Sequence, residues 1–574
     1  MARSFSILFF VLLAFLGGGN VFLPFSSNEL TVLFGLLPLF FLSINVPGWN
    51  WRGEGASPVS VLAALLFLFY VWAAAGYFYS VRPEVSFGPA VKYLTAVLLG
   101  LALILYLKET RQVREILWTC LICSGLISLF AVVQQFKPDL ILTRAETGLS
   151  SHSLFFNVNL FSCYLLFHLP LGAFLFFSSG SNRLKMLTAV IFVAILAGLL
   201  FSGSPGGQAA AIFQLIALAG YLLWEKRVDR LKLLGLGVLL ASVGYAVLVL
   251  ILPHETGDGA GGAAVPDGLI RRAWVWDHML NRFDYWRGAW RIFLDHWLTG
   301  TGPWTIFLMY PQYGVQYVPL HAHNLFMQTA ADAGLTGLIL LSASLWVLYK
   351  KCFRIVLDEK NPDRDLAFYL TLSVTGFLLH NLVEYNWITS SFTYYFTVWA
   401  LLIDFLDRQR APRGGAISSF RRFFPLFAAG CGVFAAVACA RLYLYDRAIY
   451  HDAMNVRDIK DIETFAERAK GFCRRCDFPY LAMAAVDIER FKRGEGKEFL
   501  PKAEDRIREA LQLAPYNPEA AIYLGEIRIL QDRFAEAREL LLQAKKFNAY
   551  TDSPLVSAER LEDLERKAGR PEGD

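Results

Sequence analysis

The side chains best suited to chemistry stand close together at residues 321–332. His323 is followed by Asn324, Gln328 and Asp332, and the i, i+4, i+8 spacing of these three places them on one face of a helix. A histidine at a helix start tends to stay neutral, because the helix dipole disfavours imidazolium there. A neutral imidazole can take a proton from an attacking hydroxyl group. We therefore predict that His323 is a general base or orients an acceptor, and that the three residues of the stripe bind substrate.

Further polar residues interrupt otherwise apolar sequence. Arg282 opens an aromatic-rich segment, and its guanidinium can give paired hydrogen bonds to a phosphate, so we predict it as the second catalytic residue. The other predicted substrate-binding side chains are Trp286, Asn157, Asn159, His321, His380 and Glu384. Polar residues within membrane helices also serve as hydrogen-bonding contacts between helices, and for Asn159 or Gln208 taken alone we favour that interpretation.

The pair His321 and His323 also raises the question of a metal. Two histidines at i, i+2 can bind zinc, but the sequence offers no evident third ligand and no carboxylate at metal spacing. We therefore predict a site without metal or other cofactor. A histidine that merely caps a membrane span is the structural alternative for His323.

The elements that must position these residues are membrane helices. Of the 574 residues 55% are hydrophobic, and the mean hydropathy is +0.42. The apolar residues form blocks of about 20, the length that crosses a bilayer as a helix. We predict an all-α, polytopic bundle (residues 1–446) of about 13 spans. The predicted spans are 4–24, 28–46, 58–79, 90–107, 115–136, 158–178, 185–203, 206–224, 232–252, 325–349, 366–388, 391–406 and 424–446.

The distribution of basic residues predicts the orientation. Lys and Arg collect in alternate short loops, whereas the opposite short loops carry only Arg82, Lys137 and Arg144. By the positive-inside rule the N-terminus is cytoplasmic, and both the 253–324 loop and the chain after residue 446 lie outside. The net charge of +5 is thereby explained without nucleic-acid binding.

Two segments lie outside the predicted spans. The 253–324 loop begins with a Gly- and Ala-rich tract, and its aromatic residues predict an amphipathic helix at about 280–297 that lies in the membrane interface. The tail, 447–574, matches the 34-residue tetratricopeptide pattern most clearly at 518–549, so we predict a soluble helical-repeat domain that could bind a protein partner. Its Cys473 and Cys476 form a C-x-x-C motif that can pair in an oxidising compartment.

The segment PLHAHNLFMQTAADAGLTGLI resembles the signature of the O-antigen ligase/O-antigen polymerase superfamily. In that family a His-Asn pair opens a span and is followed by an acidic residue and a G-x-x-G, here His323-Asn324, Asp332 and 334–337. Upstream, Arg282, Trp286 and the G-x-G at 300–302 resemble the family's Arg-x-x-x-Trp segment, and NVNLFSCYLL resembles its Asn-x-Asn opening of a middle span. One departure is Pro205, which stands where members carry an arginine thought to hold substrate phosphates.

The resemblance implies a function and a location. A member would transfer a glycan from a polyprenyl-diphosphate carrier to a glycan, lipid A core or protein acceptor, at the periplasmic face of the bacterial inner membrane and in contact with membrane lipid. The acceptor decides between a ligase, a polymerase and a protein O-oligosaccharyltransferase, and the sequence leaves these alternatives open. A transporter, or a non-catalytic scaffold that presents the repeat domain, is the alternative from a different functional class.

Overall fold

The computed structural model describes most of the chain. The described residues are 2–16, 30–38, 59–136, 153–155, 157–251, 268–315, 318–409, 418–452, 458–515, 517–547 and 557–568. Their regular structure is helical throughout, which confirms the all-α fold class. The Gly- and Ala-rich tract predicted at the start of the 253–324 loop lies outside the described residues up to position 267.

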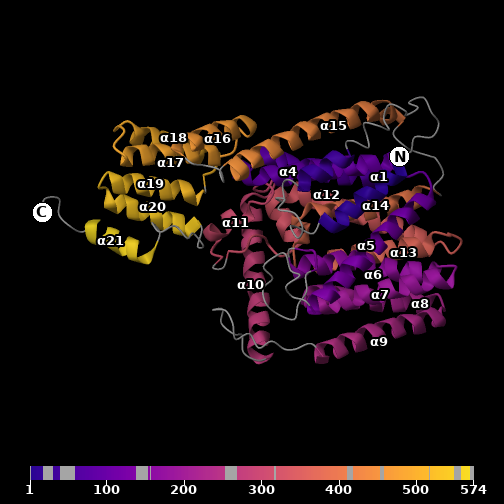
Figure 1. Cartoon of the computed structure of the whole chain (residues 1–574). Coiled ribbons are helices and arrows are strands. Elements are labelled where there is room, and N and C mark those ends of the chain that lie inside the picture. Colours follow the sequence, from indigo (N-terminus) through magenta and orange to yellow (C-terminus); the bar gives the residue numbers. More distant parts are fainter. Residues whose placement is uncertain are drawn as a thin grey trace.

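Long helices lie side by side and form the membrane bundle (Figure 1). They are α1 (Ala2–Leu16), α3 (Val61–Tyr79), α4 (Pro83–Tyr106), α5 (Thr110–Phe136), α6 (Val158–Ser178), α7 (Asn182–Ser202), α8 (Pro205–Trp224), α9 (Val228–Ile251), α12 (Leu325–Leu357), α13 (Arg364–His380), α14 (Ser390–Arg408) and α15 (Ser418–Asp446). Eight of the described helices, α3 to α9 and α12, are long and apolar enough to cross a bilayer. The chain is therefore a multi-pass membrane protein.

The remaining five predicted spans overlap with α1, the helical residues 30–38, α13, α14 and α15. These helices are shorter, less apolar or only partly described, so their crossing of the membrane stays a prediction. The predicted span 366–388 is too long, because α13 ends at His380 and a turn follows it. Within the bundle, α6 and α14 bury almost every side chain. Aromatic residues such as Phe167, Trp387 and Trp399 fill the space between them. These buried helices form the interior of the bundle and fix the positions of the polar residues at its end.

A different element caps one end of this bundle. Helix α10 (Gly268–Asp295) runs across the ends of the long helices instead of along them (Figure 1). Its Ala289 and Ile292 are buried against the short α11 (Ile306–Met309), the 3₁₀ turn η2 (Tyr310–Tyr313) and Ala331 of α12. Its other face exposes Phe283, Trp290 and Leu294. We call the end of the bundle covered by α10 the site end.

Two glycines lock the loop after α10 onto α12. Gly300 and Gly334 have φ values of +74° and +66°, and a Cβ at either position would lie 2.4 or 2.5 Å from the backbone of the other segment. Backbone hydrogen bonds from Thr301 to Ala331 (2.9 Å) and from Leu335 to Trp297 (2.7 Å) join the two segments. Gly334 also interrupts α12, with ψ −165°, a combination that essentially only glycine adopts.

Replacing Gly334 with alanine is expected to destabilise the protein by about 2–4 kcal/mol, because the new Cβ meets backbone and the φ/ψ pair is strained. Thermal unfolding of the purified protein in lipid nanodiscs measures this loss. Gly235→Ala is the matched control, since a Cβ there meets no atom within 4 Å. Equal melting temperatures for the two variants would contradict the proposed interlock.

The tail consists of helices that pair in succession. After the π-helical turn η4 (Arg447–Asp452) come α16 (Ile459–Phe472), α17 (Phe478–Lys492), α18 (Phe499–Leu513), α19 (Pro518–Leu530), α20 (Phe534–Phe547) and α21 (Ala558–Ala568). Small residues permit the close contacts: Gly525 of α19 faces Leu541 of α20, and a Cβ at Gly525 would approach that side chain to 2.9 Å. A helical C-terminal region is thus confirmed, whereas its tetratricopeptide identity stays a prediction.

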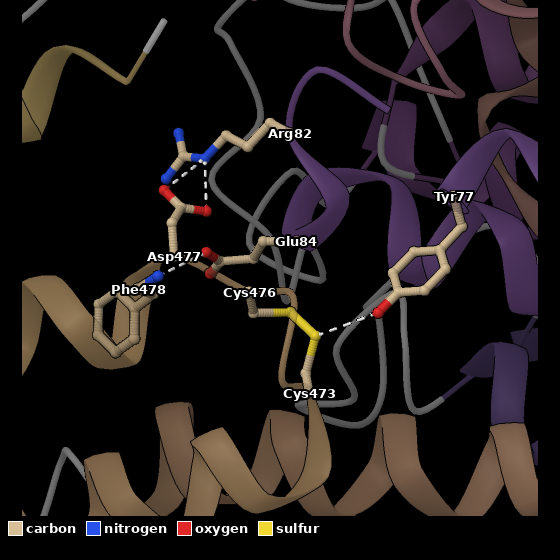
Figure 2. The surroundings of a disulfide bond; sticks show 7 residues. All are labelled: Tyr77, Arg82, Glu84, Cys473, Cys476, Asp477 and Phe478. Carbon is tan, nitrogen blue, oxygen red and sulfur yellow. Dashed lines mark hydrogen bonds and ion pairs between the residues drawn. A yellow bond between two sulfur atoms is a disulfide. The ribbon is translucent and has the colours of Figure 1, made fainter. Parts of the chain in front are cut away.

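A short loop between α16 and α17 joins the tail to the membrane bundle (Figure 2). Cys473 and Cys476 form a disulfide within it, and the hydroxyl of Tyr77 on α3 lies 3.6 Å from Cys473 Sγ. The buried carboxylate of Asp477 accepts from Arg82 Nε, with an ion-pair distance of 3.2 Å, and also contacts Asn517. We call residues 473–478 with their partners on 77–84 the tail joint.

Two further contacts complete the tail joint. The amide of Phe478 donates to Glu84 at 2.9 Å, and Arg475 donates to the carbonyl of Phe78 at 2.6 Å (Figure 2 shows the first). The tail joint therefore consists of polar contacts between residues 78–84 of the membrane bundle and the disulfide-closed turn of the tail.

We expect Asp477→Ala to loosen the tail from the bundle, because the change leaves the largely buried Arg82 without its carboxylate. Breaking one partner of a buried pair costs about 3–5 kcal/mol. Hydrogen exchange should then rise across residues 473–484 and at the start of α4. The control is Asp563→Ala in α21, which removes a more exposed set of ion pairs worth little. Unchanged exchange in Asp477→Ala would argue against a docked tail.

Candidate functional site

His323 occupies a strained backbone position at the site end. Its φ is +48°, in the left-handed region that few residues other than glycine adopt. Its amide donates to Nδ1 of His321 at 3.3 Å, and the two imidazole rings lie 4.1 Å apart between centroids. Tyr285 of α10 stacks on the His323 ring at 5.8 Å. Strain of this kind persists only where surrounding contacts hold it, and it is common at functional sites.

Glu384 is the group on which the predicted catalytic residues converge. His323 Nδ1 lies 2.7 Å from its Oε1, and Arg282 Nη2 lies 3.7 Å from its Oε2. His321 Nε2 is 4.0 Å from Oε1, and Asn159 Nδ2 donates to Oε2 at 2.7 Å. The Glu384 side chain is only 8% exposed. Four residues from three other segments of the chain thus meet at the buried carboxylate of Glu384.

The turn that carries Glu384 is fixed from two sides. Helix α13 ends at His380, and Asn381 accepts the amide of Leu325 through its carbonyl at 2.8 Å. Asn324 caps α12 by accepting from the amides of Phe326 and Met327, and its Nδ2 donates to the carbonyl of Leu382. The turn therefore moves with the start of α12, which brings Glu384 beside His323.

Lys92 of α4 supports the same turn from within the bundle. Its Nζ donates to the carbonyl of Trp387 at 2.8 Å, in the 3₁₀ turn η3 (Asn386–Ile388), and only 4% of the residue is exposed. A buried ammonium in a membrane helix is costly, so it marks a position with a definite task. Here that task is to hold the chain that follows Glu384.

The surroundings of Glu384 and His321 shift the pKa values of both groups. Burial would raise the pKa of Glu384, but the hydrogen bond from His323, together with the nearby Arg282, outweighs burial and lowers that pKa. Burial lowers the pKa of His321, so its imidazole is held neutral. The cluster thus combines an ionised carboxylate with a neutral second imidazole.

The same three side chains make a possible set of metal ligands. One ligand atom each of His321, His323 and Glu384 lies within 4.8 Å of the others. The sequence offered no third ligand at metal spacing, and Glu384 supplies one from 61 positions beyond His323 in the sequence. The absence of a metal stays a prediction.

The polar stripe of α12 is buried and bonded to protein groups. Gln328 Oε1 accepts the amide of Ala322 at 2.8 Å, and Gln328 Nε2 donates to Asp332 at 2.9 Å. Asp332 Oδ2 also accepts the amide of Trp304 at 3.1 Å. The stripe therefore anchors the 296–323 loop to α12, whereas the predicted substrate binding by its members stays a prediction.

The other predicted residues occupy different places. Asn157 caps α6 by accepting the amide of Leu160. Asn159, two positions later in the sequence, is the residue that donates to Glu384. Trp286 Nε1 donates to the carbonyl of Ala322 at 3.0 Å and so braces the His321–His323 segment. His380 is 1% exposed and lies beside α8, where a Cβ at Gly206 would approach its Cδ2 to 3.0 Å.

Pro205, which stands where the resembled family carries an arginine, has a local structural role. Pro205 is the first residue of α8, and Ser204 caps this helix by accepting the amide of Gly207. Ser204 also donates to Asn159 Oδ1 at 2.6 Å, which links the start of α8 to Glu384. Four arginines on the predicted outer side of the membrane could take the place of the family arginine. Of these, Arg287 is exposed and paired with Asp284, and the side chains of Arg144, Arg271 and Arg272 lie outside the described residues.

Sequence reasoning missed three contributors to the cluster. Lys92 carried a readable signal, a charge within an apolar span. Ser204 stood in a recognisable cap before Pro205, although nothing local linked it to Asn159. Tyr285 had no signal of its own among the aromatic residues of α10.

Two comparisons bear on this geometry. Residues 189–342 match a family model described as O-antigen ligase, a range that contains Arg282, His321 and His323. No curated protein matches the chain. Glu384 and His380 lie beyond the matched range, and Asn159 lies before it.

Proposed function

We propose that the chain, a membrane protein of the O-antigen ligase superfamily, acts as a glycosyltransferase of the ligase type. It moves a glycan from a polyprenyl-diphosphate carrier to an acceptor such as the lipid A core. The reaction takes place at the periplasmic face of the bacterial inner membrane and needs no metal. The observation that supports this most is the convergence of His323 and Arg282 on Glu384, beside a helix that lies across the bundle end.

The geometry suggests a role for each nitrogen of His323. An ionised Glu384 at 2.7 Å favours the ring proton on Nδ1, which leaves the lone pair of Nε2 for an acceptor hydroxyl. As this oxygen attacks the anomeric carbon of the donor sugar, its proton passes to Nε2. The bond from that carbon to the diphosphate oxygen breaks, and the polyprenyl diphosphate leaves with the electron pair.

The leaving group explains the position of Arg282. Negative charge grows on the diphosphate as the bond breaks, and a guanidinium stabilises it with two donors. Arg282 is 23% exposed and sits on the same helix as Phe283 and Trp290, whose exposed rings suit headgroup depth. A lipid-linked donor would place its phosphates at this depth.

The orientation is supported by two observations. Lys and Arg collect in the short loops on the side opposite the 253–324 loop, and the positive-inside rule assigns that side to the cytoplasm. The disulfide of the tail joint suits an oxidising compartment such as the periplasm. The tail, predicted as tetratricopeptide repeats, would there be free to bind a protein partner or an acceptor.

Gene deletion with surface-glycan analysis tests the proposal. In the deletion strain we expect lipid-linked polymer to accumulate and the lipid A core to carry no attached polymer. The wild-type gene should restore attachment, and Arg282→Ala should not. Single repeats still attached to the core would indicate a polymerase, and loss of protein glycans would indicate a protein O-oligosaccharyltransferase. Rescue by Arg282→Ala at normal protein levels would favour the scaffold or transporter and overturn the proposal.

A further inference from the structure

We propose that His321, His323 and Glu384 bind a zinc ion, and that zinc in this position blocks glycan transfer. Two imidazoles and one carboxylate form the ligand set of zinc sites that leave a fourth position open. Their ligand atoms already lie within 4.8 Å of one another. The side chains of His321, His323 and Glu384 are 16%, 25% and 8% exposed, so the cluster is partly shielded from solvent.

The two oxygens of Glu384 have separate tasks, and this division favours a cation. Oε1 faces both imidazoles, at 2.7 and 4.0 Å, whereas Oε2 is bound by Asn159 and lies 3.7 Å from Arg282. Asn159, itself held by Ser204, fixes the carboxylate plane as outer partners of metal ligands do. The guanidinium charge sits on the far oxygen and lowers zinc affinity without occupying the site.

Binding has a local cost that the geometry makes small. Zinc at Nε2 of His321 requires the ring proton on Nδ1, so the 3.3 Å contact from the His323 amide is exchanged for a metal–nitrogen bond. That contact is long for a hydrogen bond. His323 Nδ1 and Glu384 Oε1 need only separate slightly from 2.7 Å to admit an ion at about 2.0–2.2 Å from each.

Occupation by zinc would remove the base. With Nδ1 of His323 bound to the metal, its ring proton lies on Nε2, which then has no lone pair for the acceptor hydroxyl. The binding site stands on geometry alone, whereas the block rests on the proposed function. The two parts therefore need separate measurements.

Cobalt binding tests the site. Purified, chelator-treated protein in nanodiscs is titrated with Co²⁺, and a tetrahedral cobalt spectrum that Zn²⁺ displaces is expected. His321→Ala and Glu384→Gln should weaken binding by at least about 10–100-fold, the range for disturbed metal sites. His296→Ala, outside the cluster, is the control and should bind as the wild type does. Absence of the spectrum, or an unchanged spectrum in both ligand variants, would overturn the site.

Arg282→Ala separates the site from the proposed reaction. This variant should bind Co²⁺ several-fold more tightly, because a nearby positive charge is gone, although it transfers no glycan. In wild-type proteoliposomes, Zn²⁺ should inhibit transfer over the concentration range that displaces cobalt. Binding without inhibition would overturn the block, and weaker binding by Arg282→Ala would contradict the ligand geometry.

Discussion

Replacing His323 with alanine is expected to lower the rate of glycan transfer by about 10²–10⁴-fold, the usual contribution of a positioned acid–base group. His323 is held in a left-handed conformation with its Nδ1 2.7 Å from Glu384, so its Nε2 is the nitrogen left for an acceptor. Fold stability should fall much less than activity, because Arg282 and Asn159 still contact Glu384 and Asn324 still caps α12.

Proteoliposomes with lipid-linked donor extracted from cells provide the rate, with melting temperature as the check on folding. His296→Ala, directly after α10, controls for the loss of a histidine outside the cluster. His323→Gln is a stricter variant, since its amide can still contact Glu384 but takes no proton. Near-normal transfer by His323→Gln in well-folded protein would remove the base role and leave orientation of the acceptor.

How far the sequence predicts this site depends on the range of the contacts. The polar stripe of α12 followed from helical spacing, and α10 was expected from its aromatic period. Helix α10 nevertheless begins at Gly268, well before the predicted start near 280, because residues 268–279 carry no strong apolar period. Local patterns therefore predicted which helices exist better than where they begin.

The cluster itself was not predictable as a unit. Asn157 and Asn159 stand two positions apart, yet the first caps α6 and the second binds Glu384. Glu384 was predicted among the substrate-binding residues, but no local sequence pattern indicates that His323 and Arg282 contact it. Such meetings depend on how α6, α10 and α12 pack, and helical periodicity carries no information about partners that are distant in sequence.

The change Glu384→Gln is expected to reduce transfer by about 10²–10⁴-fold, although Glu384 itself touches no substrate in the proposed reaction. The amide keeps the shape and can still contact Asn159, but it loses the charge that fixes the His323 proton on Nδ1 and holds Arg282. The loss should fall on kcat more than on KM for the donor, because the charge acts when the proton moves. Glu384→Asp should recover part of the rate.

A double-variant comparison distinguishes positioning from general structural support. If Glu384 acts through His323, then Glu384→Gln combined with His323→Ala should be hardly slower than His323→Ala alone, since the carboxylate has no base left to orient. If Glu384 only stabilises the fold, the two losses should multiply and the melting temperature should fall with them. Glu109→Gln, at an exposed position after α4, controls for the loss of a carboxylate. Multiplied losses with unchanged stability would instead assign Glu384 a direct task at the donor phosphates through Arg282.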